Sequence, residues 1–241
     1  MQKTIGFIGY SNKTEYIINL AKVLNIVGKK VLVADGTLEQ KFKYSIPTLN
    51  KTEKQYVEHF DGIDFAIGFT SVDEIKKHIL KQTSIEEQYD LVIIDIDNVA
   101  AYESFAKEKI DKLFLFLEYS NIAMAKNKEI LKAVVNNENM EEKSEVIKVL
   151  FSQYVTRASE KYFMHQIEEL EVKFSNKEIV SEYMDQDRIA DIEFEQSGYI
   201  DMSRHTKQFT NSISEMAEEI FGDIHAGEIK KIIKLYARGR M

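Results

Sequence analysis

Residues 3–40 read KTIGFIGYSNKTEYIINLAKVLNIVGKKVLVADGTLEQ, which predicts a strand, a short turn, a helix and a second strand. The first strand is the apolar run 4–8, and the turn that follows it ends in Lys13 and Thr14. The helix has one apolar face, made of Ile17, Leu20, Ala21, Leu24 and Val27. A buried-type strand then ends on Asp35. This order brings the backbone N–H groups of a helix N-terminus, a lysine and a hydroxyl to one point, as a phosphate-binding loop requires.

The same stretch matches a longer pattern without a gap. The pattern is KGGxGK with Ser or Thr next, then NLAxxLAxxGxxVLxxDxDxQ, and the matching positions are Asn19, Leu20, Ala21, Gly28, Val31, Leu32, Asp35 and Gln40. The stretch therefore resembles the deviant Walker A region of the ParA/MinD family of ATPases. In this register, Lys13 and Thr14 take the places of the family's P-loop lysine and hydroxyl residue.

The chain departs from the family pattern at several positions. Ile8 replaces the signature lysine, Gly9 is kept, and Tyr10 and Asn12 replace the other two glycines. Thr37 stands where the family has a second aspartate. In the family, the first of these losses removes a cation that acts across the dimer, and the last removes a carboxylate that orients water. The resemblance therefore implies a very slow or inactive ATPase.

A second motif lies at residues 89–95, which read YDLVIID and resemble the family's YDxVIID. The resemblance assigns Asp95 to the magnesium-bound water, and it assigns Thr14 and Asp35 to magnesium itself. It also predicts a nucleotide site made of Gly9, Tyr10, Ser11, Asn12, Lys13, Thr14, Asp35 and Asp95. ATP and magnesium are the cofactors it implies, and a chain that binds neither is the open alternative.

Short apolar runs alternate with helical patterns along the chain, which predicts one doubly wound α/β domain over residues 1–222. Its sheet is expected to be mainly parallel with helices on both faces, as in P-loop NTPases of the SIMIBI class. The predicted strands are 4–8, 31–35, 63–69, 90–95, 112–117 and 146–152. Because open α/β sheets bind ligands at the carboxyl ends of their strands, Lys13 and Asp95 should meet there.

Composition favours a cytoplasmic protein. Its 241 residues are 44% hydrophobic, which suits a single domain with a full core. The chain has no cysteine, no charged-then-apolar leader and no apolar run of about 18 residues. A net charge of −8 makes DNA an unlikely partner, because phosphate neutralisation by basic residues supplies most nonspecific DNA affinity.

Residues 223–241 predict a basic amphipathic helix. Ile229, Ile232, Ile233 and Tyr236 share one face, and Lys230, Lys231, Lys234 and Arg238 flank it. Three interpretations stay open: attachment to the anionic inner face of the cell membrane, contact with a protein partner or a second copy, and packing on its own domain. MinD-type proteins use a C-terminal helix of this character.

The sequence therefore predicts a degenerate ParA/MinD-like protein that binds ATP weakly or not at all. We expect a homodimeric scaffold that localises or assembles a cell-envelope machine through a protein partner, as the pilus- or secretion-associated relatives (TadZ/CpaE-like) do. Two alternatives stay open: a slow but active ATPase for partition or septum positioning, and a nucleotide-free protein-interaction module.

Overall fold

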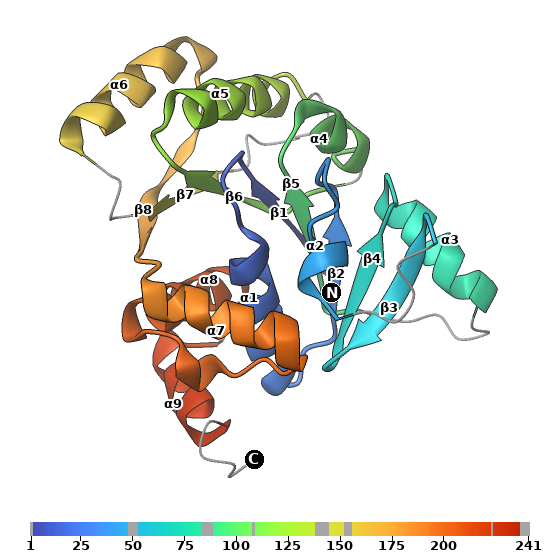
Figure 1. The fold of residues 1–241 in the computed structure, drawn as a ribbon. Coiled ribbons are helices and arrows are strands. Elements are labelled where there is room, and N and C mark those ends of the chain that lie inside the picture. Colours follow the sequence, from blue (N-terminus) through green and yellow to red (C-terminus); the bar gives the residue numbers. More distant parts are fainter. Residues whose placement is uncertain are drawn as a thin grey trace.

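A computed structural model describes residues 2–47, 53–82, 89–107, 109–137, 145–151, 156–222 and 224–236. Its centre is an eight-stranded sheet with the order β3-β4-β2-β5-β1-β6-β7-β8 (Figure 1). The strands are β1 (Lys3–Ile8), β2 (Val31–Asp35), β3 (Tyr56–Phe60), β4 (Ile63–Ile67), β5 (Leu91–Ile96), β6 (Lys112–Leu117), β7 (Val146–Phe151) and β8 (Phe174–Ser181). All pairings are parallel except that of β3 with β4. The predicted doubly wound, mainly parallel sheet is confirmed.

Helices cover both faces of this sheet (Figure 1). One face carries α1 (Thr14–Ile26), the short α2 (Phe42–Ser45), α7 (Asp185–Ser197), α8 (Lys207–Ile220) and α9 (Ala226–Tyr236). The other face carries α3 (Val72–Gln82), α4 (Val99–Phe105), α5 (Asn121–Val135) and α6 (Arg157–Ile167). Two short 3₁₀ turns, η2 (Glu168–Leu170) and η3 (Met202–Arg204), follow α6 and α7.

Two apolar clusters, one on each face, form the core. Side chains alternate across a strand, so Phe7 faces α1 whereas its neighbour Ile8 faces the α4 and α5 layer. The same alternation in β5 turns Ile93 toward α1 and Ile94 away from it. Asp95 has the parity of Ile93, which directs its side chain to the α1 side.

The six predicted strands are present, and β3 and β8 were missed. Both missed strands lie at an edge of the sheet and are only partly buried, so their sequences lack a continuous apolar run. Serines precede two of the helices, Ser71 before α3 and Ser120 before α5, and both hydroxyls accept a hydrogen bond from the first turn of their helix.

The C-terminal helix packs on its own domain. Ile229 is fully buried and Ile233 is 6% exposed, and both belong to the cluster that holds α1 and α8. These two residues therefore do not form a free apolar face for a membrane or partner, which corrects that part of the prediction. The apolar stripe of a helix shows that this face is covered, but it does not distinguish the helix's own domain from a membrane or a partner protein. The side chain of Tyr236 and all of Arg238 lie outside the described residues. No helix in the described ranges is long and apolar enough to cross a membrane.

Candidate functional site

The turn after β1 is held tightly against the neighbouring strand. Gly9 has a φ of 124°, and a Cβ atom there would lie 2.7 Å from the carbonyl oxygen of Phe116. This combination favours glycine on both conformational and steric grounds. The next residue, Tyr10, donates its backbone N–H to Asn127 Oδ1 at 2.9 Å. Asn127 is fully buried on α5, so this helix fixes the loop from the other face of the sheet.

Lys13 points into the protein. Its side chain is 0% exposed, and its Nζ lies 2.9 Å from Asp95 Oδ1. The same amino group donates to the carbonyl oxygens of Gly9 at 2.7 Å and Ser11 at 3.4 Å. The predicted meeting of Lys13 and Asp95 at the carboxyl ends of the adjacent strands β1 and β5 is therefore confirmed. The amino group of Lys13 thus makes one ion pair and two hydrogen bonds within the protein, before any ligand binds.

Thr14 is engaged in the same way. Its hydroxyl donates to Asn12 Oδ1 at 3.0 Å, and its backbone N–H contacts the same oxygen at 3.4 Å. The Asn12 amide nitrogen in turn donates to Glu15 at 2.7 Å. Asn12, at a glycine position of the ParA/MinD pattern, thus binds the first residue of α1 through its side chain.

Asp35 organises the turn after β2. Its Oδ1 accepts from the backbone N–H of Thr37 at 3.0 Å and from the Thr37 hydroxyl at 2.6 Å, while its Oδ2 accepts from Phe42 N–H at 3.0 Å. The Thr37 hydroxyl also accepts from the backbone N–H of Lys41 at 3.2 Å. The threonine that replaces the family's second aspartate therefore locks this turn to β2.

Asp35 and Asp95 lie side by side, since they are register partners on β2 and β5. Burial, and then repulsion by Asp95, raises the pKa of Asp35 from 3.8 to about 6. Burial also raises the pKa of Asp95, whereas the charge of Lys13 and, more weakly, that of Lys41 lowers it. Asp95 Oδ2 and the buried Ser11 hydroxyl have no hydrogen-bond partner among the described residues.

Two other departures from the family pattern have clear structural positions. Ile8 is fully buried in the apolar cluster on the α4 and α5 side, so this position presents nothing to the loop surface. Tyr10 is 41% exposed at the loop surface.

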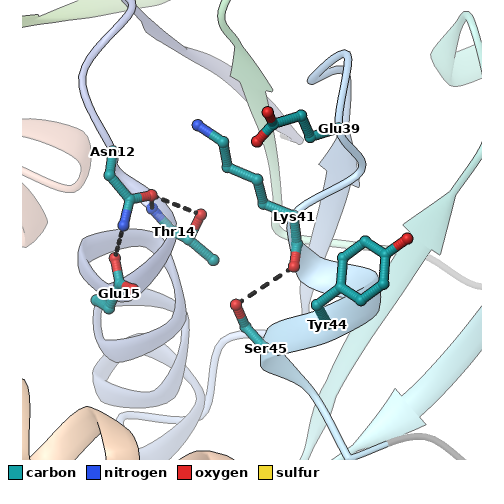
Figure 2. Close-up of a pocket in the computed structure, with 7 residues that line it drawn as sticks. All are labelled: Asn12, Thr14, Glu15, Glu39, Lys41, Tyr44 and Ser45. Carbon is teal, nitrogen blue, oxygen red and sulfur yellow. Dashed lines mark hydrogen bonds between the residues drawn. The ribbon is translucent and has the colours of Figure 1, made fainter.

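A cavity of about 680 Å³ opens between the start of α1 and the turn that leads into α2 (Figure 2). Small-molecule sites usually measure roughly 300–1,000 Å³. One wall comes from the loop and α1, and the other from residues 39–45. The lining side chains are Asn12, Thr14, Glu15, Glu39, Lys41, Tyr44 and Ser45.

The residues fit the phosphates of a nucleotide in kind and place. Three groups meet at the carboxyl edge of the sheet: a lysine, a helix N-terminus, and the buried Ser11 hydroxyl, which has no partner in the described ranges. Lys13 and Thr14 would hold the phosphates, and Asp95 and Thr14 offer the oxygen atoms that magnesium prefers. Magnesium, when bound, neutralises phosphate charge. Binding requires Lys13 and Thr14 to exchange their internal partners, whereas Asp35 stays committed to the β2 turn.

Sequence reasoning missed three parts of this site. Asn127 interrupts the apolar stripe of α5, a polar residue at a core position that signals a buried contact. After Asp95 the chain continues with Ile96, Asp97 and Asn98, where the ParA/MinD pattern has Thr-Pro-Pro. The side chains of Asp97 and Asn98 tie down the β2 turn: Asp97 accepts from Leu38 N–H, and Asn98 donates to Asp97 and Gly36. Lys41 lies in the cavity wall, which no spacing rule predicts.

Comparisons with known structures identify the fold. The chain is similar to a ParA family ATPase from Chlorobium tepidum, with a TM-score of 0.61 and 14% identity over 90% of this chain and 97% of that one. It is also similar to the MinC:MinD complex of Aquifex aeolicus (TM-score 0.56, 13% identity, 91% and 96%). A putative plasmid partition protein from Borrelia burgdorferi, bound to AMPPNP, matches with a TM-score of 0.52 and 11% identity over 92% and 98%.

The chain thus has the α/β fold of the ParA/MinD-type P-loop ATPases. No protein-family model matches its sequence, and no curated protein matches it significantly.

Proposed function

We propose that this chain is a ParA/MinD-like scaffold that binds ATP and magnesium weakly, hydrolyses ATP very slowly and works as a dimer with a protein partner. The observation that carries this proposal is the internal bonding of the phosphate site: Lys13 is paired with Asp95, and Thr14 with Asn12. A nucleotide must displace both contacts, which lowers its net affinity. The loss of the cation at Ile8 and of the carboxylate at Thr37 then limits the rate of hydrolysis.

Similar structures support a nucleotide and a protein partner for this proposal. One of them holds AMPPNP, and another is a complex of MinD with MinC. We propose that the machine served by this chain is part of the cell envelope, of the pilus or secretion type. Partition or septum positioning by a slow ATPase is the second candidate, and the matching partition protein favours it.

Steady-state hydrolysis should be below about 1 s⁻¹, the low end of typical enzyme turnover. The physical reason is that Ile8 provides no cation and Thr37 provides no carboxylate, whereas the ParA/MinD pattern has both. Phosphate release in the presence of ATP and magnesium measures this rate. Turnover at or above 1 s⁻¹ would contradict the scaffold proposal.

A nucleotide titration by calorimetry separates the three candidates. Binding with turnover at or above about 1 s⁻¹ supports an active ATPase, and binding with turnover below that rate, or with none, supports the scaffold. Absence of binding at millimolar ATP would leave the protein-interaction module as the function.

The basic side of α9 supports a proposal for peripheral attachment to an anionic membrane. Lys231 and Lys234 are exposed, while Ile229 and Ile233 are buried, so the attraction would be mainly electrostatic. Pelleting with anionic liposomes should therefore fall as salt rises, because the Debye length shrinks from about 10 Å at 0.1 M to about 3 Å at 1 M. Replacing Lys231 and Lys234 by glutamate should abolish pelleting at low salt.

The control for this experiment is the replacement of Lys77 and Lys81, two exposed lysines of α3, by glutamate. Truncation of α9 is unsuitable, because it would remove Ile229 and Ile233 from the core. Equal pelleting of both double variants would show that α9 is not the attachment surface.

A further inference from the structure

Lys41 is an unpaired cation beside the phosphate loop. Of the seven described residues that line the cavity, it alone is basic. Within the described part of the chain, its amino group has no hydrogen bond or ion pair. Figure 2 shows its side chain extended from the start of α2, with the amino group between Glu39 and the loop that carries Asn12 in this view. The charge of Lys41 also reaches the buried end of the site, where it lowers the pKa of Asp95.

The backbone of Lys41 is fixed to the sheet. Its N–H donates to the Thr37 hydroxyl, which itself donates to Asp35 at the end of β2. Its carbonyl oxygen accepts from the backbone N–H groups of Tyr44 and Ser45 in the turn of α2. The ammonium group therefore extends from a rigid base, which limits the conformational entropy lost when it contacts a ligand.

The two lysines of the site have different roles in the unliganded protein. Lys13 is fully buried and neutralises Asp95, whereas Lys41 is half-buried and faces the cavity. The two carboxylates of the cavity differ as well. Glu15 is bonded to Asn12 and lies 3.7 Å from Arg188, while Glu39 is exposed. An anion that enters the cavity thus meets Lys41 as its first uncommitted cation.

We propose that Lys41 binds the terminal phosphates of a nucleoside triphosphate, and supplies within one chain the positive charge that Ile8 no longer provides. This inference rests on the proposed nucleotide-binding function and adds a residue that the sequence pattern does not contain. Thr37 is part of the same arrangement, since its hydroxyl anchors the Lys41 backbone. Glu39 opposes binding, because its carboxylate lies in the same cavity wall.

The test is calorimetric titration of the full chain with ATP, inorganic pyrophosphate and adenosine. Lys41→Ala should weaken ATP and pyrophosphate binding by roughly 10- to 100-fold, the range for loss of one hydrogen bond to a charged group. Adenosine affinity should stay the same, because Lys41 recognises phosphate and not the base. Glu39→Gln should tighten ATP and pyrophosphate binding several-fold.

Lys43→Ala is the matched control, since Lys43 lies in α2, directly after Lys41 and Phe42, but does not line the cavity. It should bind both phosphate ligands within about twofold of the parent, because its side chain does not line the cavity and salt screens a charge outside the site. Thermal unfolding followed by circular dichroism verifies that each variant is folded.

The outcomes separate this inference from the function on which it rests. Parent protein that binds ATP, with Lys41→Ala binding it equally well, overturns the role of Lys41 and leaves the nucleotide-binding function intact. If Lys41→Ala weakens adenosine binding as much as ATP binding, the role of Lys41 as a phosphate ligand is also overturned. Parent protein that binds pyrophosphate but not ATP refutes the nucleotide function, and weaker pyrophosphate binding by Lys41→Ala then supports Lys41 as a phosphate ligand. Parent protein that binds neither phosphate ligand refutes both.

Discussion

Replacing Lys13 by alanine should lower the free energy of unfolding by about 3–5 kcal/mol, the usual cost of removing one partner from a buried ion pair. The ammonium group and the Asp95 carboxylate are both essentially inaccessible to solvent, 2.9 Å apart. Without Lys13, the charge of Asp95 stays buried and uncompensated, and the Gly9 carbonyl loses its donor. Urea unfolding followed by far-ultraviolet circular dichroism measures the change, since the chain has no tryptophan.

An exposed ion pair of the same length provides the control. Lys126 lies 2.9 Å from Glu129, but the two side chains are 47% and 54% exposed. Lys126→Ala should cost less than about 1 kcal/mol, because water already solvates both charges. Asp95→Asn should recover part of the stability lost in Lys13→Ala, since it removes the unpaired charge. Equal effects of Lys13→Ala and Lys126→Ala would contradict the burial argument.

This expectation also affects how the nucleotide site is tested. Loss of ATP binding in Lys13→Ala would be ambiguous, because the variant can lose its fold as well as its phosphate contact. Lys41 has no side-chain bond in the described structure, so its substitution gives the clearer test of phosphate recognition.

The second large effect is a pH dependence of stability that arises from Asp191. This residue of α7 is 3% exposed and accepts a hydrogen bond from Tyr183. The other charged or titratable groups around it are His205, whose Nε2 lies 3.7 Å from Asp191 Oδ1, and the more distant Glu15 and Arg188. Burial raises the pKa of Asp191 from 3.8 to about 7 against the opposing effects of Tyr183 and His205.

The direction of the effect follows from proton binding. Between pH 4 and 7, the folded protein keeps the Asp191 proton, whereas the unfolded chain has released it. The contribution of Asp191 to stability is therefore complete below about pH 4 and is lost as the pH rises through 7. Since one pKa unit corresponds to about 1.4 kcal/mol, the full loss is on the order of 4 kcal/mol. Asp35, whose pKa is raised to about 6, acts in the same direction.

Urea unfolding of the parent and of Asp191→Asn at pH 5, 6, 7 and 8 isolates the Asp191 contribution. The variant should lose less stability than the parent as the pH rises, because asparagine has no proton to release. Asp185→Asn removes an exposed carboxylate from the same helix and should keep the slope of the parent. Parallel curves for the parent and Asp191→Asn would refute the assignment.

The central strands of the sheet could be predicted from the sequence, because each of them is a short apolar run that is recognisable without its neighbours. Runs such as 31–34 and 113–117 are continuously apolar, and the turn before α1 carries its own motif. The edge strands β3 and β8 mix polar and apolar residues, so only their pairing with a neighbour defines them. The meeting of Lys13 with Asp95 could be predicted from two adjacent parallel strands. Their ion pair and complete burial could not, because both depend on how the loop folds over the end of the sheet.

The missed site residues depend on tertiary contacts. Asn127 reaches the loop from α5; its place in an apolar stripe indicates a buried contact, but it does not reveal that the partner is the backbone of Tyr10. Lys41 faces the cavity only because Asp35 and Thr37 fold the β2 turn back toward α1. For α9, the amphipathic pattern was correct, but the pattern of a helix that packs on its own domain is the same as that of one that binds a membrane.

The locked β2 turn and the buried Ile8 limit which substitutions this site accepts. A lysine at position 8 would place an ammonium group in a fully buried apolar cluster. An aspartate at position 37 would set a third carboxylate beside Asp35 and Asp95 and remove the hydroxyl that anchors Lys41. Each of these substitutions alone would destabilise the fold before it added any chemistry. Changing the chemistry of this site therefore requires coupled substitutions, because the residues that form it also hold the sheet edge together.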